Sequence, residues 1–242
     1  MSHILEEDSN HALEARSMQK KGLSKLLAGL LIAVPAGATI IGGTVTGGGA
    51  FANGGVFIKL TPPIANPFGP PNSVGNNTFQ NNNLYGFDED QNIVLAAPLN
   101  VDVVASGVVS PLPAGSTVAS HYIFFDPGPS TSMIGTVDFD SDIVAIITST
   151  GFLLASDFLA NTGVNYLNPG ARGLEAGDDV TISGARQILF DTTASTPGDY
   201  VRVLTVFSPG AIPEPGTIFL LPIGMVAIGV LAKRAPSRRP ER

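Results

Sequence analysis

Cysteine is absent from this chain, and so is tryptophan. Without cysteine the protein forms no disulfide and has no thiolate metal ligand or cysteine nucleophile, so an exported form would depend on its apolar core for stability. Histidine is scarce as well, with three residues in 242. If the two near the start are removed with a leader, only His121 remains, and sites built from several histidines are excluded.

The scarcity of histidine also restricts catalysis. A Ser-His-Asp hydrolase would need His121 as its base, but this residue lies in "VASHYIFF", which predicts a strand. No Gly-x-Ser-x-Gly elbow occurs. Paired carboxylates for glycoside hydrolysis stay open because acidic residues are abundant, although the lack of tryptophan and the four tyrosines disfavour sugar stacking. We therefore expect that the protein is not an enzyme.

Basic residues are rare in the middle of the chain. Between Asn53 and Ile212 there are four basic and fourteen acidic residues, a formal charge of −10. The last ten residues, from Lys233 to Arg242, hold five basic and one acidic residue. An acidic body would be repelled by phosphates, so nucleic acid is not an expected partner. The basic tail follows an apolar stretch and is typical of a membrane anchor.

The N-terminal region has the order of a secretory signal. A basic segment from Met18 (Lys20, Lys21, Lys25) precedes the apolar residues 26–34. Small residues at Ala50 and Ala52 fit signal peptidase, which predicts residues 1–52 as N-terminal extension and signal peptide and a mature start at Asn53. A second candidate site, Ala36-Gly37-Ala38, is closer to the apolar residues.

Two alternatives stay open for this region. Because the segment before the apolar residues is long, Met18 is a candidate start codon beside Met1. A retained transmembrane anchor would be the other interpretation, but Pro35 and the glycines from Gly37 onward disfavour a continuous spanning helix.

Glycine and proline together make up 47 residues, which suits short strands joined by turns. Residues 53–90 are rich in Pro, Asn and Gly, so we expect mostly loop with one strand at 55–60. Residues 91–208 alternate β-branched runs with turn signals. These predict a strand in 116–128 that ends at an Asp-Pro-Gly turn, strands on both sides of Asp140–Asp142 and of a Ser-Gly break at 183–184, and a strand after Pro197. One short helix is expected at 155–163.

The expected fold class is therefore mainly β. A single antiparallel β-sandwich or jelly-roll-like domain is flanked by the N-terminal signal peptide and by a C-terminal transmembrane helix.

An acidic triplet in the body raises the question of calcium. Asp138, Asp140 and Asp142 have the spacing that opens an EF-hand loop, but Ile143 and Ser149 stand where that loop needs Gly and Glu. The three carboxylates would either bind calcium or lie as solvated charges in a turn. Apart from this possible calcium site, no cofactor is expected.

The C-terminal 31 residues, 212–242, have three parts in a fixed order. Pro213-Glu214-Pro215 is held extended by its prolines and stays outside a sheet ladder. Residues 216–232 carry no charge, which predicts a short transmembrane helix. A basic anchor follows and places the C-terminus in the cytoplasm by the positive-inside rule; its residues are Lys233, Arg234, Arg238 and Arg239.

This order resembles the PEP-CTERM sorting signal of bacterial exosortase substrates. The resemblance implies that a membrane-embedded, cysteine-dependent exosortase recognises Pro213, Glu214 and Pro215 and processes the tail. The tail is longer than usual, and Pro222 interrupts the span. A plain single-span membrane protein with a chance Pro-Glu-Pro is the alternative. Residues 84–207 also resemble the β-rich ectodomains found ahead of this signal, which brings no activity.

The sequence thus predicts a protein exported across the bacterial inner membrane, anchored transiently, and then placed in the cell envelope or extracellular matrix. Its expected partners are signal peptidase, the membrane, an exosortase and possible exopolysaccharide. The alternative function is a surface carbohydrate- or protein-binding module, with or without calcium as its cofactor.

Overall fold

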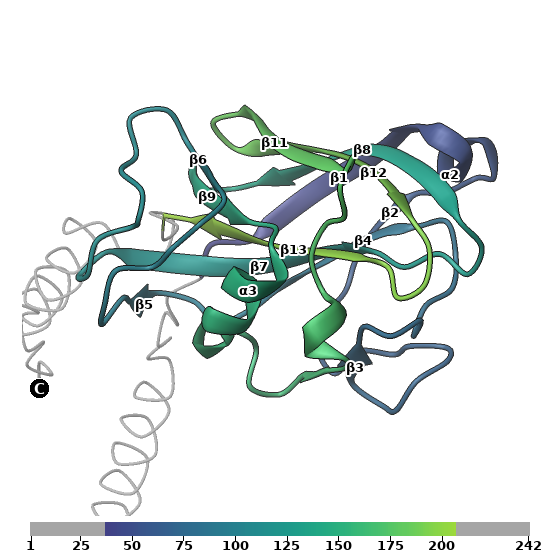
Figure 1. The fold of residues 1–242 in the computed structure, drawn as a ribbon, viewed down its shortest axis with the longest axis horizontal. Helices are drawn as coiled ribbons and strands as arrows, with labels where there is room; N and C mark the ends of the chain where they lie inside the picture. Colours follow the sequence, from purple (N-terminus) through teal and green to yellow (C-terminus); the bar gives the residue numbers. More distant parts are fainter. Residues whose placement is uncertain (1–36, 207–242) are drawn as a thin grey trace, which may run out of the picture. The chain divides into compact units, whose positions relative to one another are not determined.

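The computed structural model describes residues 37–206 (Figure 1), which fall within one compact unit, Ala36–Ile212. The first half contains β1 (Ile40–Gly47), α2 (Gly48–Ala52), β2 (Phe57–Lys59), β3 (Ser73–Val74), β4 (Leu84–Asp88), β5 (Ile93–Val94), β6 (Val103–Val104) and β7 (Thr117–Phe125). The second half contains β8 (Thr131–Phe139), β9 (Ile143–Ile147), α3 (Thr150–Ala155), η1 (Asp157–Leu159), β10 (Asn165–Tyr166), η2 (Pro169–Ala171), β11 (Asp179–Gly184), β12 (Gln187–Ala194) and β13 (Asp199–Thr205).

These strands form two main sheets. The smaller sheet has the order β1-β8-β12-β11. The larger sheet runs β2-β4-β7-β13-β9-β6, with β5 paired to β7, and a two-stranded sheet joins β10 to β3. A mainly β fold is therefore confirmed, and the two sheets are consistent with a sandwich. The pairing is not wholly antiparallel, because β2 pairs with β4 and β10 with β3 in parallel.

One apolar core fills the space between the two main sheets. Its inward residues include Val137 and Phe139 of β8 and Phe190 of β12, which meet Phe125 of β7 and Val203 of β13. Fully burying such side chains stabilises a fold by about 1.5–3 kcal/mol each. This core therefore holds the sandwich together.

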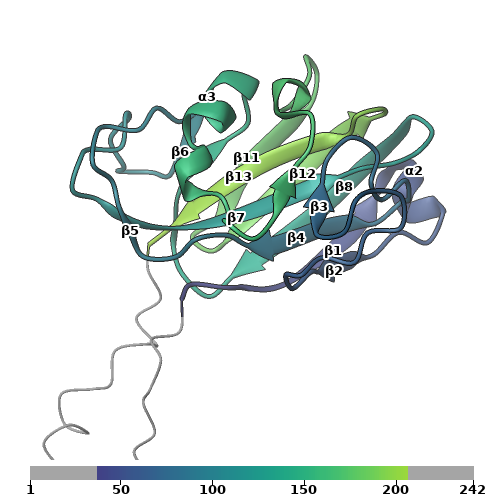
Figure 2. The ribbon, with the colours of Figure 1, turned by 90° about the horizontal axis from the view of Figure 1, so that it is seen from below.

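A second core covers the other face of the large sheet. Tyr122 and Phe124 of β7 and Tyr200 of β13 pack there against Leu153 of α3 and Leu159 of η1. Figure 1 and Figure 2 show α3 on this side of the sheet. The large sheet is thus covered on both faces, which explains why β7 and β13 are buried along nearly their whole length and not only at alternate residues.

A glycine at the end of β1 fixes a sharp reversal into α2. Gly48 has φ +78°, and a Cβ there would lie 2.5 Å from the carbonyl oxygen of Ser132. Only glycine fits this position without moving the backbone.

The folded part begins earlier than the sequence suggested. The segment ending at Ala52, which was expected to leave with the signal peptide, forms β1 and α2, and Ala50 is fully buried. A mature start at Asn53 would remove an edge strand that pairs with β8 along Ile40–Gly47. The folded domain therefore begins at β1, because the tertiary pairing of this glycine-rich strand with β8 is not visible in the local sequence. The cleavage after Ala52 stays a prediction.

Other boundaries differ less. Residues 53–90 hold β2, as expected, but also β3 and β4. The helix expected at 155–163 lies earlier, as α3, and only a short 3-10 turn covers 157–159. The strands expected around Asp140–Asp142, at the Ser-Gly break and after Pro197 are confirmed as β8, β9, β11, β12 and β13.

No helix within residues 37–206 is long and apolar enough to cross a membrane. The expected transmembrane helix at 216–232 lies outside the described residues, as do the signal segment up to Ala36, the Pro213-Glu214-Pro215 tag and the basic anchor.

Candidate functional site

The chain enters and leaves the sandwich at the same end. The turn between β8 and β9 holds both segments: the amide of Asp140 donates to the carbonyl of Thr39 at 3.0 Å, and the amide of Val206 donates to the carbonyl of Asp142 at 2.9 Å. Figure 2 shows the start of β1 and the end of β13 on this side of the molecule. A group of polar side chains at this end binds Thr39 and Ile40, where the chain enters the sandwich.

Asp88, the last residue of β4, is the centre of that set. Its Oδ2 accepts from the hydroxyl of Thr39 at 2.7 Å and lies 2.8 Å from Nζ of Lys59. Its Oδ1 accepts from the amide of Ile40 at 3.0 Å and lies 2.8 Å from Nδ1 of His121. Burial alone would raise the pKa of Asp88, but the contacts with His121, Lys59 and Ile40 hold this pKa well below its usual range.

His121 connects this carboxylate to the end of β13. Its Nε2 lies 3.0 Å from Oγ1 of Thr205. Asp88, His121 and Thr205 therefore have the connectivity of an acid, a base and a hydroxyl nucleophile. His121 and Thr205 are both fully buried, however, and neither lines any of the three surface hollows described below. The arrangement fits a structural link between strands, and His121 is a strand histidine, as expected.

The three aspartates considered for calcium have separate protein partners. Asp138 accepts from Nε2 of Gln187 at 2.8 Å, Asp140 accepts from the amide of Thr39 at 2.8 Å, and Asp142 accepts from Nε of Arg186 at 2.6 Å. Within residues 37–206 no group of three or more His, Asp or Glu side chains is placed to hold a metal ion. The positions of these three carboxylates therefore do not support a calcium site, which stays a prediction.

Three hollows mark the described surface. One, of about 540 Å³, lies beside β1 and the β8–β9 turn and is lined by Ile41, Gly42, Asp138, Phe139, Asp140, Arg186 and Gln187. The other two, of about 730 and 320 Å³, adjoin through Val108, Val144 and Val206. Their walls are mostly aliphatic. A sugar ring would find no exposed aromatic face in them, since Phe139 is 1% exposed.

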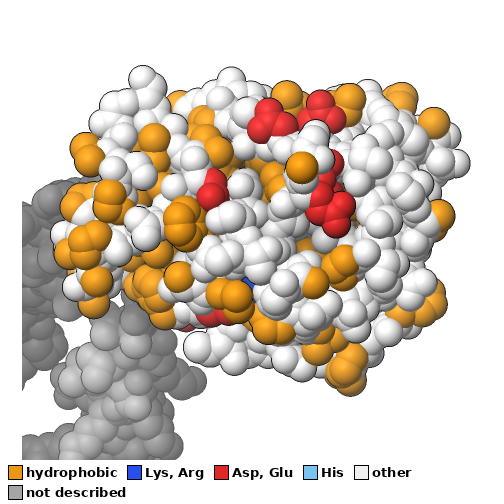
Figure 3. Space-filling model, in the orientation of Figure 1, with side chains coloured by type: hydrophobic (Ala, Val, Ile, Leu, Met, Phe, Trp, Pro, Cys, Tyr) orange, Lys and Arg blue, Asp and Glu red, His pale blue; other side chains and the backbone are white. Residues whose placement is uncertain are grey.

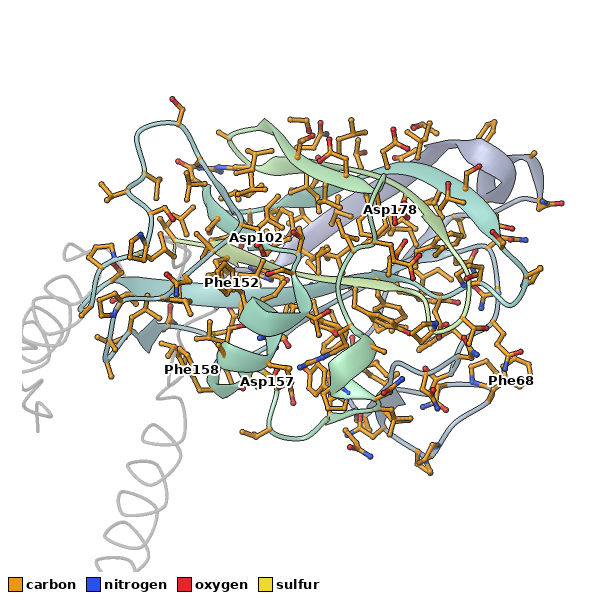
Figure 4. The ribbon with its side chains drawn as sticks, viewed as in Figure 1. Phe68, Asp102, Phe152, Asp157, Phe158 and Asp178 are labelled. Carbon is orange, nitrogen blue, oxygen red and sulfur yellow. The ribbon has the colours of Figure 1, made fainter. Side chains whose placement is uncertain are left out.

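Two exposed phenylalanines lie far from each other on the surface. Phe68 and Phe158 are 63% and 54% exposed, and Figure 4 shows them on opposite sides of the domain. Sequence reasoning disfavoured sugar stacking because tryptophan is missing, and the positions of these two rings agree with it.

A buried ion pair was not foreseen. Glu89 lies in the segment 53–90 that was expected to be mostly loop, yet it is 3% exposed and binds Arg202 through Nε at 2.7 Å and Nη2 at 3.0 Å. The hydroxyls of Ser120 and Tyr166 donate to the same carboxylate, each at 2.6 Å. No local signal reveals this cluster, because Glu89 and Arg202 are 113 residues apart.

One face of the domain is acidic. Figure 3 shows acidic side chains gathered over the region of β11 and β12, with almost no Lys or Arg. Asp179 and Asp191 are direct partners across these two strands. Beneath them, Asp199 is 2% exposed and its Oδ2 has no hydrogen-bond partner. Burial, together with the charges of Asp178 and Glu175, raises the pKa of Asp199 to about 7.

Comparisons with known proteins identify no family: no protein-family model, no curated protein and no solved structure matches the chain significantly.

Proposed function

We propose that this chain is an exported cell-envelope or extracellular-matrix protein, sorted through a PEP-CTERM-like tail and processed by an exosortase. One observation carries the proposal: a proline-bracketed glutamate, an uncharged 17-residue stretch and a basic end follow one another in residues 213–242. In this proposal the ectodomain has a structural or still unknown role, and its His121 is fully buried.

The body supports this function in two ways. Its described residues form a folded β-rich domain whose last strand ends at Thr205, so only a short segment separates the domain from Pro213. Its charge is strongly negative whereas the tail is basic. By the positive-inside rule the basic residues favour a tail in the cytoplasm, which leaves the acidic domain on the outside.

The test is to replace Pro213, Glu214 and Pro215 with alanine in a host that carries an exosortase. We expect the variant to stay in the membrane fraction with Arg242 attached, while the unaltered chain loses its tail in an intact-mass measurement. A matched control replaces Pro236 and Pro240 with alanine, which leaves the tag intact. Equal tail removal in both variants would refute the proposal.

The second candidate is a surface binding module. The two adjoining hollows around Val144 favour an apolar protein segment over exopolysaccharide as the ligand, because their walls are aliphatic. A glycan array and a peptide array with the purified domain distinguish the two ligand classes.

A further inference from the structure

Two places in the sequence fit signal peptidase, and the fold distinguishes between them. Cleavage after Ala52 removes β1, whose Ile40 and Val45 are buried in the core between the sheets. Cleavage after Ala38 leaves β1 complete and makes Thr39 the first residue. Ala36 and Ala38 then occupy the two positions that need small side chains.

Around Thr39 the structure already holds acceptors for a free amino group. The backbone nitrogen of Thr39 lies 2.8 Å from Oδ1 of Asp140. Its hydroxyl donates to Oδ2 of Asp88 at 2.7 Å, and Nζ of Lys59 lies within hydrogen-bond reach of the same hydroxyl. In the uncut chain this nitrogen is an amide that donates one hydrogen to Asp140. Once the bond between Ala38 and Thr39 is cut, the same nitrogen becomes an ammonium ion beside the same carboxylate.

The charges around this nitrogen are unequal while the chain is uncut. Asp88 and Asp140 supply two carboxylates that bind Thr39, whereas Lys59 supplies one positive charge, in an ion pair with Asp88. His121 touches Asp88 from the other side. An ammonium group on Thr39 would add a second cation at 2.8 Å from Asp140, and hydrogen bonds between charged partners are stronger than neutral ones.

We infer that signal peptidase cleaves this protein between Ala38 and Thr39, and that the new α-ammonium group of Thr39 is bound by Asp140 as a permanent ion pair closing the end of the sandwich. The reaction is hydrolysis of one peptide bond: water supplies the hydroxyl to the Ala38 carboxylate and the proton to the Thr39 amine. The inference rests on the export that the proposed function includes.

The first test expresses the full chain in a secreting bacterial host and determines both ends by N-terminal sequencing and intact mass. A start at Thr39 is the expected result. A start at Asn53, with export intact, overturns the inference and leaves the sorting proposal standing. An uncut chain in the cytoplasm overturns both, whereas a Thr39 start with Arg242 retained contradicts tail processing alone.

Two matched variants locate the cleaved bond. Ala38→Leu places a large side chain at the position before the cut, so the Thr39 start should disappear. Ala52→Leu, at an exposed position in α2, should leave the Thr39 start unchanged. The opposite pattern overturns the inference, and both readouts are independent of how the variants fold because cleavage accompanies translocation.

The second test examines the ion pair through pH. A free α-amino group titrates near 7.7–8.0, and a carboxylate at its side raises this pKa in the folded state. The stabilisation is therefore complete below that range and is lost as the pH rises through the raised value. Between pH 7 and 10, the Tm of the processed protein should fall by about 2–4 °C more than that of processed Asp140→Asn.

The other groups at this site are the same in both proteins. Lys59, Asp88 and His121 stay in place, so their titrations cancel in the comparison. Identical Tm profiles for the two proteins would overturn the ion pair even if the start at Thr39 is correct.

Discussion

Arg202 and Glu89 form a bidentate ion pair in the interior, with both side chains 0% exposed and the nearest nitrogen and oxygen 2.7 Å apart. Nη1 of Arg202 also donates to Oγ of Ser156 at 2.6 Å, which ties the segment after α3 to the large sheet. Burial would lower the pKa of Arg202, but the charge of Glu89 outweighs it and keeps the guanidinium ionised. The pair therefore fixes the helical layer to the large sheet.

Removing one partner should be costly. Arg202→Met leaves Glu89 as a buried, unpaired charge, and we expect a loss of about 3–5 kcal/mol in the free energy of unfolding, measured by denaturant titration. Arg186→Met is the control, because its ion pair with Asp142 is more than half exposed and should be worth at most about 1 kcal/mol. Equal losses would show that the buried pair contributes no more than a surface one.

Asp199 should make stability fall as the pH rises. Its pKa is about 7 in the fold and near 3.8 unfolded, so the folded state holds its proton more tightly. That advantage is complete below about pH 4 and is lost as the pH rises through 7.

Asp199→Asn should consequently stabilise the protein at pH 8, by up to about 4 kcal/mol, and have little effect at pH 4. Thermal unfolding at the two pH values measures it. Asp191→Asn, on the exposed acidic face, is the comparison and should gain at most about 1 kcal/mol. A pH-independent effect of Asp199→Asn would contradict the assignment.

A chain that begins at Asn53 should not fold cooperatively, whereas one that begins at Thr39 should. The shorter chain lacks Ile40 and Val45, and burying these two side chains is worth roughly 3–6 kcal/mol. That is a large part of the ordinary stability of a domain, about 5–15 kcal/mol. Near-ultraviolet circular dichroism and thermal unfolding distinguish the two chains, and a sharp transition in the shorter one would count against β1 as part of the domain.

Thr205 should matter for stability and not for chemistry. Thr205→Val preserves the shape but leaves Nε2 of His121 without its partner, at a cost of about 1–3 kcal/mol. Thr193→Val, at an exposed position of β12, should change stability by less than about 0.5 kcal/mol. If the unaltered protein hydrolyses esters and Thr205→Val does not, Asp88, His121 and Thr205 would instead act as a catalytic triad.

How far the sequence predicts this fold depends on whether the signals are local. β7 is rich in apolar residues and is followed by an Asp-Pro-Gly turn, and β13 is preceded by a Pro-Gly turn. Each strand can therefore be predicted from a few neighbouring residues. β1 contains three glycines among its eight residues and follows a leader-like segment, so the local sequence does not predict it, and its pairing with β8 makes it a strand. The same holds for the site: the burial of His121 follows from its strand, whereas the contact of Thr39 with Asp140 spans 101 residues.

Thr39 and Val206, near the two ends of the described part, lie at one end of the sandwich, and this has a consequence for the opposite end. There the reversals 127–130 and 195–198 lie next to each other, because Phe125 pairs with Asp199 and Thr131 with Ala194. These reversals and α2 contain no ionisable side chain. A molecule that binds at this end would contact mainly uncharged residues. Its affinity should therefore change little with ionic strength.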